Sequence, residues 1–227
     1  MIAIDGPAAS GKSTTARRVA EGLGYLHLDT GAMYRAVALK ALEKRIDPAD
    51  IRAVEALMKS TEVTLKRVDG QLRTYLDGTD VTEKIRRPEV SKAASSISSI
   101  KKVREAMVSE QRRIGKNGGV VLEGRDIGSV VFPNAELKIY LTANLGERAR
   151  RRQRELREQG VDVTLASIRK QISERDRKDS SRDTSPLVKP PAAIEIDSSD
   201  LTVDQQVSIV VEKAKEIIEQ KERSRCK

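Results

Sequence analysis

The stretch Gly6-Pro7-Ala8-Ala9-Ser10-Gly11-Lys12-Ser13 follows the apolar run 1–5 and leads directly into a helix-forming segment. It has the pattern G-x-x-x-x-G-K-[ST], in which glycines let the backbone wrap closely around phosphate oxygens. In such a loop the lysine reaches the β- and γ-phosphates, the serine hydroxyl binds Mg²⁺, and the helix dipole points its positive end at the anion. The stretch therefore predicts a nucleoside triphosphate site. The alternative is a glycine-rich turn that binds nothing.

Length and composition favour one globular domain with room for an insertion. The 227 residues can bury a substantial core. The single cysteine, Cys226, excludes an internal disulfide, and together with the single histidine, His27, it leaves too few ligands for zinc. The first residues form the strand of the phosphate loop, and no apolar run approaches the ~20 residues of a membrane helix. We expect a cytoplasmic protein without a signal peptide or a membrane partner.

The net charge of +9 favours polyanionic partners, either nucleic acid or a small phosphorylated substrate. Proteins that bind single-stranded nucleic acid usually stack bases on aromatic side chains. This chain has four tyrosines, one phenylalanine and no tryptophan, and they are scattered along it. We therefore expect no nucleic-acid partner.

Four further segments have the apolar character of short buried strands: residues 26–29, 120–123, 137–141 and 193–197. Helix-period stretches lie between them. This alternation predicts a three-layer α/β fold, a five-stranded parallel sheet flanked by helices, with ligands at the carboxyl ends of the strands. The polar residues that end these runs should gather near the phosphate loop; they are Asp5, Asp29, Glu123 and Asp126.

The connection between the second and third core strands spans roughly 90 residues, too many for one crossover helix. Alternating apolar residues flank Asp69-Gly70, and Asp77-Gly78 marks a second turn. One long helix is then predicted from Pro88 through Met107. We expect a small antiparallel subdomain over residues 62–85, inserted into the main fold.

The segment Asp29-Thr30-Gly31-Ala32-Met33-Tyr34-Arg35 leaves the second strand and starts a helix. Thr30 is expected to cap this helix, and Arg35 to project near the phosphate loop. The alternative is an ordinary helix start with Arg35 as a surface residue.

The third strand ends in Glu123, where a phosphate-loop protein usually places an acidic group that holds Mg²⁺ or its waters. Gly124-Arg125-Asp126-Ile127-Gly128 follows at once. Two glycines around an Arg-Asp pair predict a sharp loop that exposes both charges to the same cleft. The alternative is an ion pair between Arg125 and Asp126 that caps the next turn.

Basic residues dominate the last third of the chain. Six of the ten residues 148–157 are arginine, and such a run is normally a solvated helix face. In the segment 174–182 a helical period stops in a serine-rich turn, and arginines at such an end can swing over a triphosphate. A final amphipathic helix is predicted behind the capping box Thr202-x-x-Gln205.

With these segments in hand, the chain resembles the bacterial cytidylate kinases, a family of nucleoside monophosphate kinases, over essentially its whole length. The phosphate loop and the segment 29–35 have counterparts in many nucleotide kinases. The Gly-Arg-Asp loop at 124–126 and the insert at 62–85 are more particular to this family. The matching segments also include Val103-Arg104-Glu105 and residues 174–182.

The resemblance implies transfer of the γ-phosphoryl group of ATP to CMP or dCMP, with Mg²⁺ as cofactor. It implies a core of residues 1–61 and 86–227, a lid over about 146–185 and a monophosphate-binding insert at 62–85, acting as a monomer. The implied ATP-binding residues are Gly6, Pro7, Ala8, Ala9, Ser10, Gly11, Lys12, Ser13 and Thr14. Ser13 and, through water, Glu123 would hold the metal.

The acceptor site follows from the same resemblance. Ser95, Arg104 and Asp126 would read cytosine, because its N4 donates a hydrogen bond while N3 and O2 accept. The implied CMP-binding residues are Thr30, Arg35, Ser95, Arg104, Arg125, Asp126, Arg175, Asp179 and Arg182. The implied catalytic residues are Lys12, Arg125, Arg175 and Arg182.

Two other functions fit parts of the pattern. The charge and the arginine run are compatible with a regulatory or nucleic-acid-associated NTPase, although no Asn-Lys-x-Asp guanine signal occurs. A small-metabolite kinase, such as one acting on shikimate, would share the phosphate loop. The Gly-Arg-Asp loop and the insert argue against that function.

Overall fold

The computed structural model describes residues 1–68 and 71–225. The chain forms two compact units. The first contains Met1–Leu26 and Gly119–Lys227, and the second contains His27–Gly118. Within the described ranges, no helix is long and apolar enough to cross a membrane.

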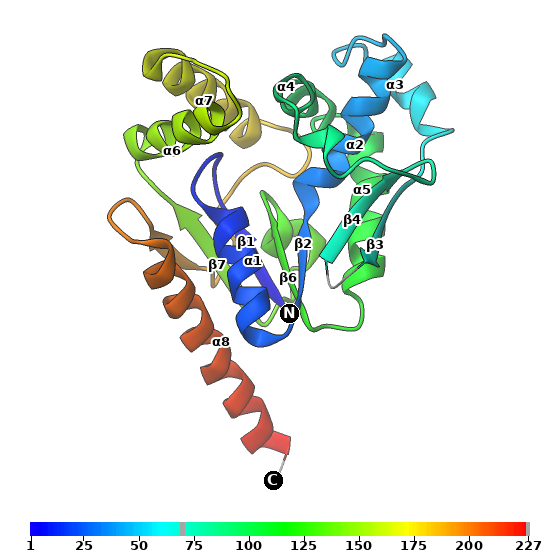
Figure 1. Cartoon of the computed structure of the whole chain (residues 1–227). Helices are drawn as coiled ribbons and strands as arrows, with labels where there is room; N and C mark the ends of the chain where they lie inside the picture. Colours follow the sequence, from blue (N-terminus) through cyan, green and yellow to red (C-terminus); the bar gives the residue numbers. More distant parts are fainter. Residues whose placement is uncertain (69–70, 226–227) are drawn as a thin grey trace. The chain divides into compact units, whose positions relative to one another are not determined.

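A five-stranded sheet with the order β2-β6-β1-β7-β8 forms the framework (Figure 1). Its strands are β1 (Ile2–Asp5), β2 (Leu26–Asp29), β6 (Val120–Gly124), β7 (Leu137–Thr142) and β8 (Ile194–Asp197). β1 pairs in parallel with β6 and β7, and β7 pairs in parallel with β8. The α/β fold with a parallel sheet and all four further strands predicted from the sequence are confirmed.

The strand order places the phosphate loop at a switch point of the sheet. From β1 the chain passes to β2 on one side, whereas β7 lies on the other side of β1. In open α/β sheets, ligands bind outside the carboxyl ends of the strands at such a point. The loop after β1 occupies that position.

In the described part of the first unit the α-helices are α1 (Lys12–Leu23), α6 (Leu145–Glu158), α7 (Leu165–Ser180) and α8 (Val203–Arg225). The predicted capping box begins α8, since the Thr202 N–H donates to Gln205 Oε1 at 2.8 Å and the Gln205 N–H donates to Thr202 Oγ1 at 3.2 Å. α6 and α7 pack against each other through a small apolar cluster.

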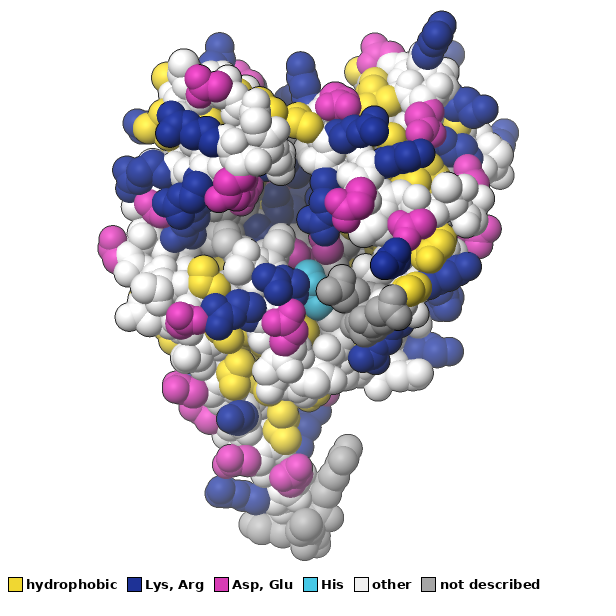
Figure 2. All heavy atoms as spheres, viewed as in Figure 1, with side chains coloured by type: hydrophobic (Ala, Val, Ile, Leu, Met, Phe, Trp, Pro, Cys, Tyr) yellow, Lys and Arg dark blue, Asp and Glu magenta, His cyan; other side chains and the backbone are white. Residues whose placement is uncertain are grey.

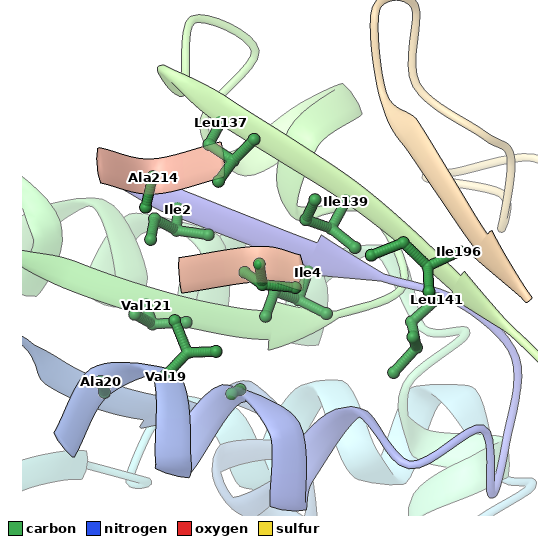
Figure 3. Packing of buried hydrophobic residues seen from close by; sticks show 12 residues of the cluster. Ile2, Ile4, Val19, Ala20, Val121, Leu137, Ile139, Leu141, Ile196 and Ala214 are labelled. Carbon is green, nitrogen blue, oxygen red and sulfur yellow. The ribbon is translucent and has the colours of Figure 1, made fainter. Parts of the chain in front are cut away.

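The main core of this unit lies between the sheet and the helices α1 and α8 (Figure 3). The strand residues Ile4, Val121 and Ile139 are fully buried there, and Val19 of α1 faces them. All four residues of β1 are buried, which explains why the strand is apolar up to Asp5 at its carboxyl end. This core fixes the end of β1, and with it the start of the phosphate loop.

The second unit is mostly helical and carries a three-stranded antiparallel sheet of order β3-β4-β5. α2 packs against α4 and against β4. Lys40 on α2 is buried and pairs with Asp77 in the turn after β4, at 2.6 Å. The elements are α2 (Thr30–Glu43), α3 (Ile51–Met58), β3 (Val63–Val68), β4 (Gln71–Leu76), β5 (Thr79–Asp80), a 3₁₀ turn (Lys84–Arg86), α4 (Pro88–Ile97) and α5 (Lys101–Gly115).

The antiparallel strands expected in the insert are present, and the turn at Asp77-Gly78 is confirmed by positive φ at both residues. The predicted turn at Asp69-Gly70 lies outside the described residues.

The expectation of one uninterrupted helix from Pro88 to Met107 is wrong. Ser98 Oγ and Ser99 Oγ donate to the carbonyls of Ser95 and Ser96, and the chain becomes extended at Ile100. Short hydroxyl side chains that bond to nearby backbone compete with the helical ladder. The result is two helices, α4 and α5.

Candidate functional site

The phosphate loop has the backbone that its sequence requires. Gly6 and Gly11 have φ of 149° and 94°, where an L side chain is strained. A Cβ on Gly6 would lie 2.0 Å from the Leu141 carbonyl oxygen. Gly11 is the residue immediately before α1 and provides no side-chain cap, so the first amides of the helix are left for an anion.

Lys12 points back into the loop. Its Nζ donates to the Pro7 carbonyl at 2.6 Å and to Ser10 Oγ at 3.2 Å, and the side chain is buried. Burial, followed by the charge of Arg125, lowers the Lys12 pKa well below its usual value. A bound polyphosphate would supply the negative charge that favours the ammonium form.

Ser13 and Glu123 meet at the start of α1. Ser13 Oγ donates to Glu123 Oε2 at 2.6 Å, and Glu123 is only 4% exposed. A hydroxyl and a carboxylate at this spacing are the oxygen ligands that Mg²⁺ prefers. Among the described residues no group of three or more His, Cys, Asp and Glu side chains suits a metal by itself, so a cation here would need further ligands from substrate or water.

Asp5, at the end of β1, holds the loop after β6. It accepts the N–H groups of Ile127 and Gly128 at 2.8 and 2.7 Å. Burial raises the Asp5 pKa to about 6. These bonds draw the Gly-Arg-Asp loop onto the sheet, where the chain turns into a short π-helical segment (Ile127–Val131).

That anchoring corrects one expectation from the sequence. Asp126 is 5% exposed, so the loop does not expose both charges as predicted. Arg125 pairs with Asp179 rather than capping the next turn with Asp126, its Nε donating to Asp179 Oδ2 at 2.9 Å. The reason is that Asp5 pulls the backbone after Asp126 inward.

Asp179 forms ion pairs with three arginines that were predicted to be catalytic. Its carboxylate lies 2.9 Å from Arg125, 3.1 Å from Arg182 and 4.0 Å from Arg175. Burial acts to raise the Asp179 pKa, but the three guanidinium groups lower it below its usual value. We call Asp179 with Arg125, Arg175 and Arg182 the arginine cluster. It concentrates cations that a phosphate can engage.

The arginine run 148–157 lies on α6 and is only partly a solvated face. Figure 2 shows Lys and Arg side chains interspersed with acidic ones on the visible face of the region of α6 and α7. Arg148, however, is 8% exposed and contacts Ala8 of the phosphate loop. Arg151 donates to the Ser10 carbonyl at 3.2 Å and to the Ser198 carbonyl at 2.6 Å. Neither contact is predictable from the sequence, because helical period alone does not show which arginines of a run face the loop.

A cavity of about 440 Å³ adjoins the phosphate loop. It runs along α6 to the chain before α8, and charged and polar groups line much of it. Its volume is within the range of small-molecule sites. The lining residues are Ala9, Gly11, Thr14, Glu147, Arg151, Arg154, Glu155, Glu158, Leu201, Thr202, Val203 and Gln206.

The second unit holds the other predicted acceptor residues. Arg104 is 2% exposed; its guanidinium lies 5.4 Å from the centroid of the Tyr34 ring and donates to the Ser98 carbonyl at 3.0 Å. The half-buried Ser95 lies in the preceding helix, α4. These contacts fix the orientation of the planar Arg104 guanidinium group, which is a hydrogen-bond donor.

At the start of α2 the capping residue differs from the predicted one. Asp29, not Thr30, caps the helix by accepting the Ala32 N–H at 3.1 Å, and Thr30 is the first helical residue. Asp29 also pairs with Arg35 at 2.6 Å. Burial acts to raise the Asp29 pKa, but Arg35 lowers it. The residue that caps α2 therefore also fixes the side chain of Arg35.

Comparison with known proteins decides the family. The model of the family described as cytidylate kinase matches residues 2–216. The chain belongs to the cytidylate kinase family. Its activity is accordingly the phosphorylation of CMP or dCMP with ATP.

Curated relatives named cytidylate kinase match almost the whole chain. The protein of Pelotomaculum thermopropionicum is 52% identical, covering 92% of this chain and 93% of its own. That of Caldicellulosiruptor bescii is 49% identical, covering 93% of both, and that of Bacillus subtilis is 45% identical, covering 98% and 97%. The resemblance found in the sequence is confirmed, and the two other functions are not those of this family.

Proposed function

We propose that this enzyme holds the triphosphate of ATP on residues 6–14 and transfers the γ-phosphoryl group in line to the acceptor. The contact of Ser13 Oγ with Glu123 Oε2 beneath a complete phosphate loop carries the proposal. Residues that fit Mg²⁺ stand beside the amides that fit phosphate. When bound, Mg²⁺ would neutralise phosphate charge, with Ser13 as ligand and Glu123 acting directly or through water.

Lys12 and the arginine cluster would supply the remaining positive charge needed for phosphoryl transfer. The charges of the arginine cluster act on Lys12, since Arg125 and Arg175 both lower the Lys12 pKa. The transferred phosphoryl group carries dispersed negative charge in the transition state. We assign Lys12, Arg125, Arg175 and Arg182 to its stabilisation. Asp179, which restrains three of them, would release them to phosphate and contact the sugar.

The cavity beside Gly11 and Thr14 is our candidate for the nucleoside of ATP. It adjoins the loop that would hold the phosphates and contains both donors and acceptors. No covalent enzyme intermediate is required, because positioning and charge neutralisation account for transfer.

For the acceptor, we assign Arg35 and Arg125 to the phosphate, and Ser95, Arg104 and Asp126 to the base, with Thr30 alongside. Arg104 would donate to N3 and O2 of cytosine, and Asp126 would accept from N4. Uracil offers a carbonyl in place of that donor, so the hydrogen bond from the base to Asp126 would be lost. Residues 62–85 are proposed as the monophosphate-binding insert, about 146–185 as the lid, and the remainder as the kinase core.

A panel of acceptors tests this proposal. The protein is mixed with ATP, Mg²⁺ and each of CMP, dCMP, UMP and AMP, and nucleoside diphosphates are separated by ion-exchange chromatography. CDP and dCDP should form fastest, and EDTA should abolish their formation. Failure to form CDP, or faster use of AMP, would refute it. Size-exclusion chromatography tests the expected monomer, and an unchanged rate after adding RNA would agree with the absence of a nucleic-acid partner.

A further inference from the structure

Two helices of the proposed lid, α6 and α7, form hydrogen bonds with one residue of the phosphate loop, Ala8. The Ala8 N–H donates to Asp176 Oδ1 of α7 at 3.3 Å, and Arg148 Nη1 of α6 donates to the Ala8 carbonyl at 3.2 Å. Arg148 and Asp176 also form an ion pair with each other. Arg148 is fixed from behind, because its Nε donates to the Ala143 carbonyl at 2.9 Å. Both polar groups of Ala8 are thereby satisfied from outside the loop.

These contacts occupy the Ala8 amide but none of the amides at the start of α1. Pro7 has no N–H, so Ala8 supplies the first backbone donor after Gly6, and that donor is bound to Asp176. The amides at the start of α1 remain available for phosphate. The next residue, Ala9, has φ of 56°, a conformation that persists only where surrounding contacts hold it.

The same segment of α7 carries residues of the arginine cluster. Asp176 directly follows Arg175 and stands one turn before Asp179. Its attachment to Ala8 therefore ties the cluster to the loop. A displacement of α7 would move Arg175 and disturb the backbone around Ala8 together.

We propose that Arg148 and Asp176 are positioning residues that fix the Ala8 peptide groups and set the phosphate loop in register with Arg175 and Arg182. The proposal rests on the function proposed above for those arginines. Neither residue touches the reacting atoms; they act through Ala8 and through α7.

The first test is the kinetics of Asp176→Asn. Loss of one charge-assisted contact should lower kcat for CMP about tenfold, while KM for CMP changes less than about threefold. Asp176→Glu, which keeps the charge, should recover at least half of that loss. Glu174→Gln removes the same charge from an exposed neighbouring position on α7 and should keep wild-type kcat. Wild-type kcat in Asp176→Asn would overturn the proposal.

A double-mutant cycle with Arg148→Gln tests whether the two residues act as one unit. If both work through Ala8, the double variant should be no more than about twofold slower than the slower single variant. Multiplication of the two single effects would show independent roles and refute the pairing. Thermal unfolding of each variant identifies any that is not folded, and Arg148→Met or Asp176→Ala then replaces it in the cycle.

Hydrogen exchange of the ligand-free protein gives a readout that needs no activity. The peptide that contains Ala8 should exchange faster in Asp176→Asn than in wild type, with no change in Glu174→Gln. Unchanged exchange would refute the contact. If wild type failed to phosphorylate CMP, the proposed function would fall, yet this measurement would still decide whether Asp176 holds Ala8.

Discussion

Replacing Asp179 by asparagine should destabilise the ligand-free enzyme through its arginines. The Asp179 side chain is 5% exposed. Its carboxylate lies 2.9 Å from the guanidinium group of Arg125, 3.1 Å from that of Arg182 and 4.0 Å from that of Arg175. Removing one partner of a buried ion pair costs about 3–5 kcal/mol, whereas an exposed pair is worth about 0–1 kcal/mol. Arg182 is 7% exposed but Arg175 is 41% exposed, so the cluster lies between these limits. We expect a loss of about 3 kcal/mol.

Thermal unfolding followed by circular dichroism measures this loss. For a chain of this size about 1 kcal/mol shifts the midpoint by 2–4 °C, so Asp179→Asn should unfold about 6–12 °C below wild type. Asp183→Asn, at an exposed position nearby, removes the same charge and should shift the midpoint by less than about 2 °C.

Two further conditions separate repulsion among the arginines from general damage. Inorganic phosphate should raise the midpoint of Asp179→Asn more than that of wild type, because it replaces the missing anion. Since the Asp179 pKa is lowered by folding, its stabilisation is present above the unfolded-state pKa of about 3.9 and is lost as the pH falls below it. The two proteins should converge in acid. An equal response of both to phosphate, or a midpoint unchanged at neutral pH, would contradict the reasoning.

Three other changes have definite expected outcomes. Lys12→Ala should lower kcat by about 100-fold or more without lowering the unfolding midpoint, because burial already disfavours the ammonium; a rate near wild type would remove Lys12 from transfer. Burial raises the Asp5 pKa to about 6, so its ionisation should weaken folding by about 3 kcal/mol as the pH rises from 4 to 6, and Asp5→Asn should lack that slope in urea unfolding. Asp126→Ala should reduce the preference for CMP over UMP about tenfold in kcat/KM, and an unchanged ratio would show that Asp126 does not read the base.

The main fold was predictable because its signals are local. Each core strand is a short apolar run, and the order of strands and helices leaves few topologies for a parallel sheet. The phosphate loop was predictable for the same reason, since its glycines, lysine and serine lie within eight residues. The break after Ile97 was not, because the hydrophobic period continues across Ser98 and Ser99 while their hydroxyls bond to the backbone.

Long-range pairings were the least predictable part of the site. Arg125 has a neighbouring carboxylate in Asp126, yet it pairs with Asp179, which is far away in the chain. Arg148 and Asp176 are ordinary members of charged helices by sequence, and only the packing of α6 on α7 brings them to Ala8. The partners of a charge depend on tertiary packing, which the spacing of residues on one helix does not encode.

The close approach of Gly6 to the Leu141 carbonyl separates two kinds of constraint within one motif. Any side chain at residue 6 would collide with backbone of the neighbouring strand whether or not nucleotide is present. Lys12 is buried and donates to the Pro7 carbonyl, but truncating its side chain to alanine creates no clash of this kind. In a deep mutational scan, substitutions at Gly6 should therefore lower the cellular abundance of the protein. Lys12→Ala should instead be depleted only when growth depends on catalysis.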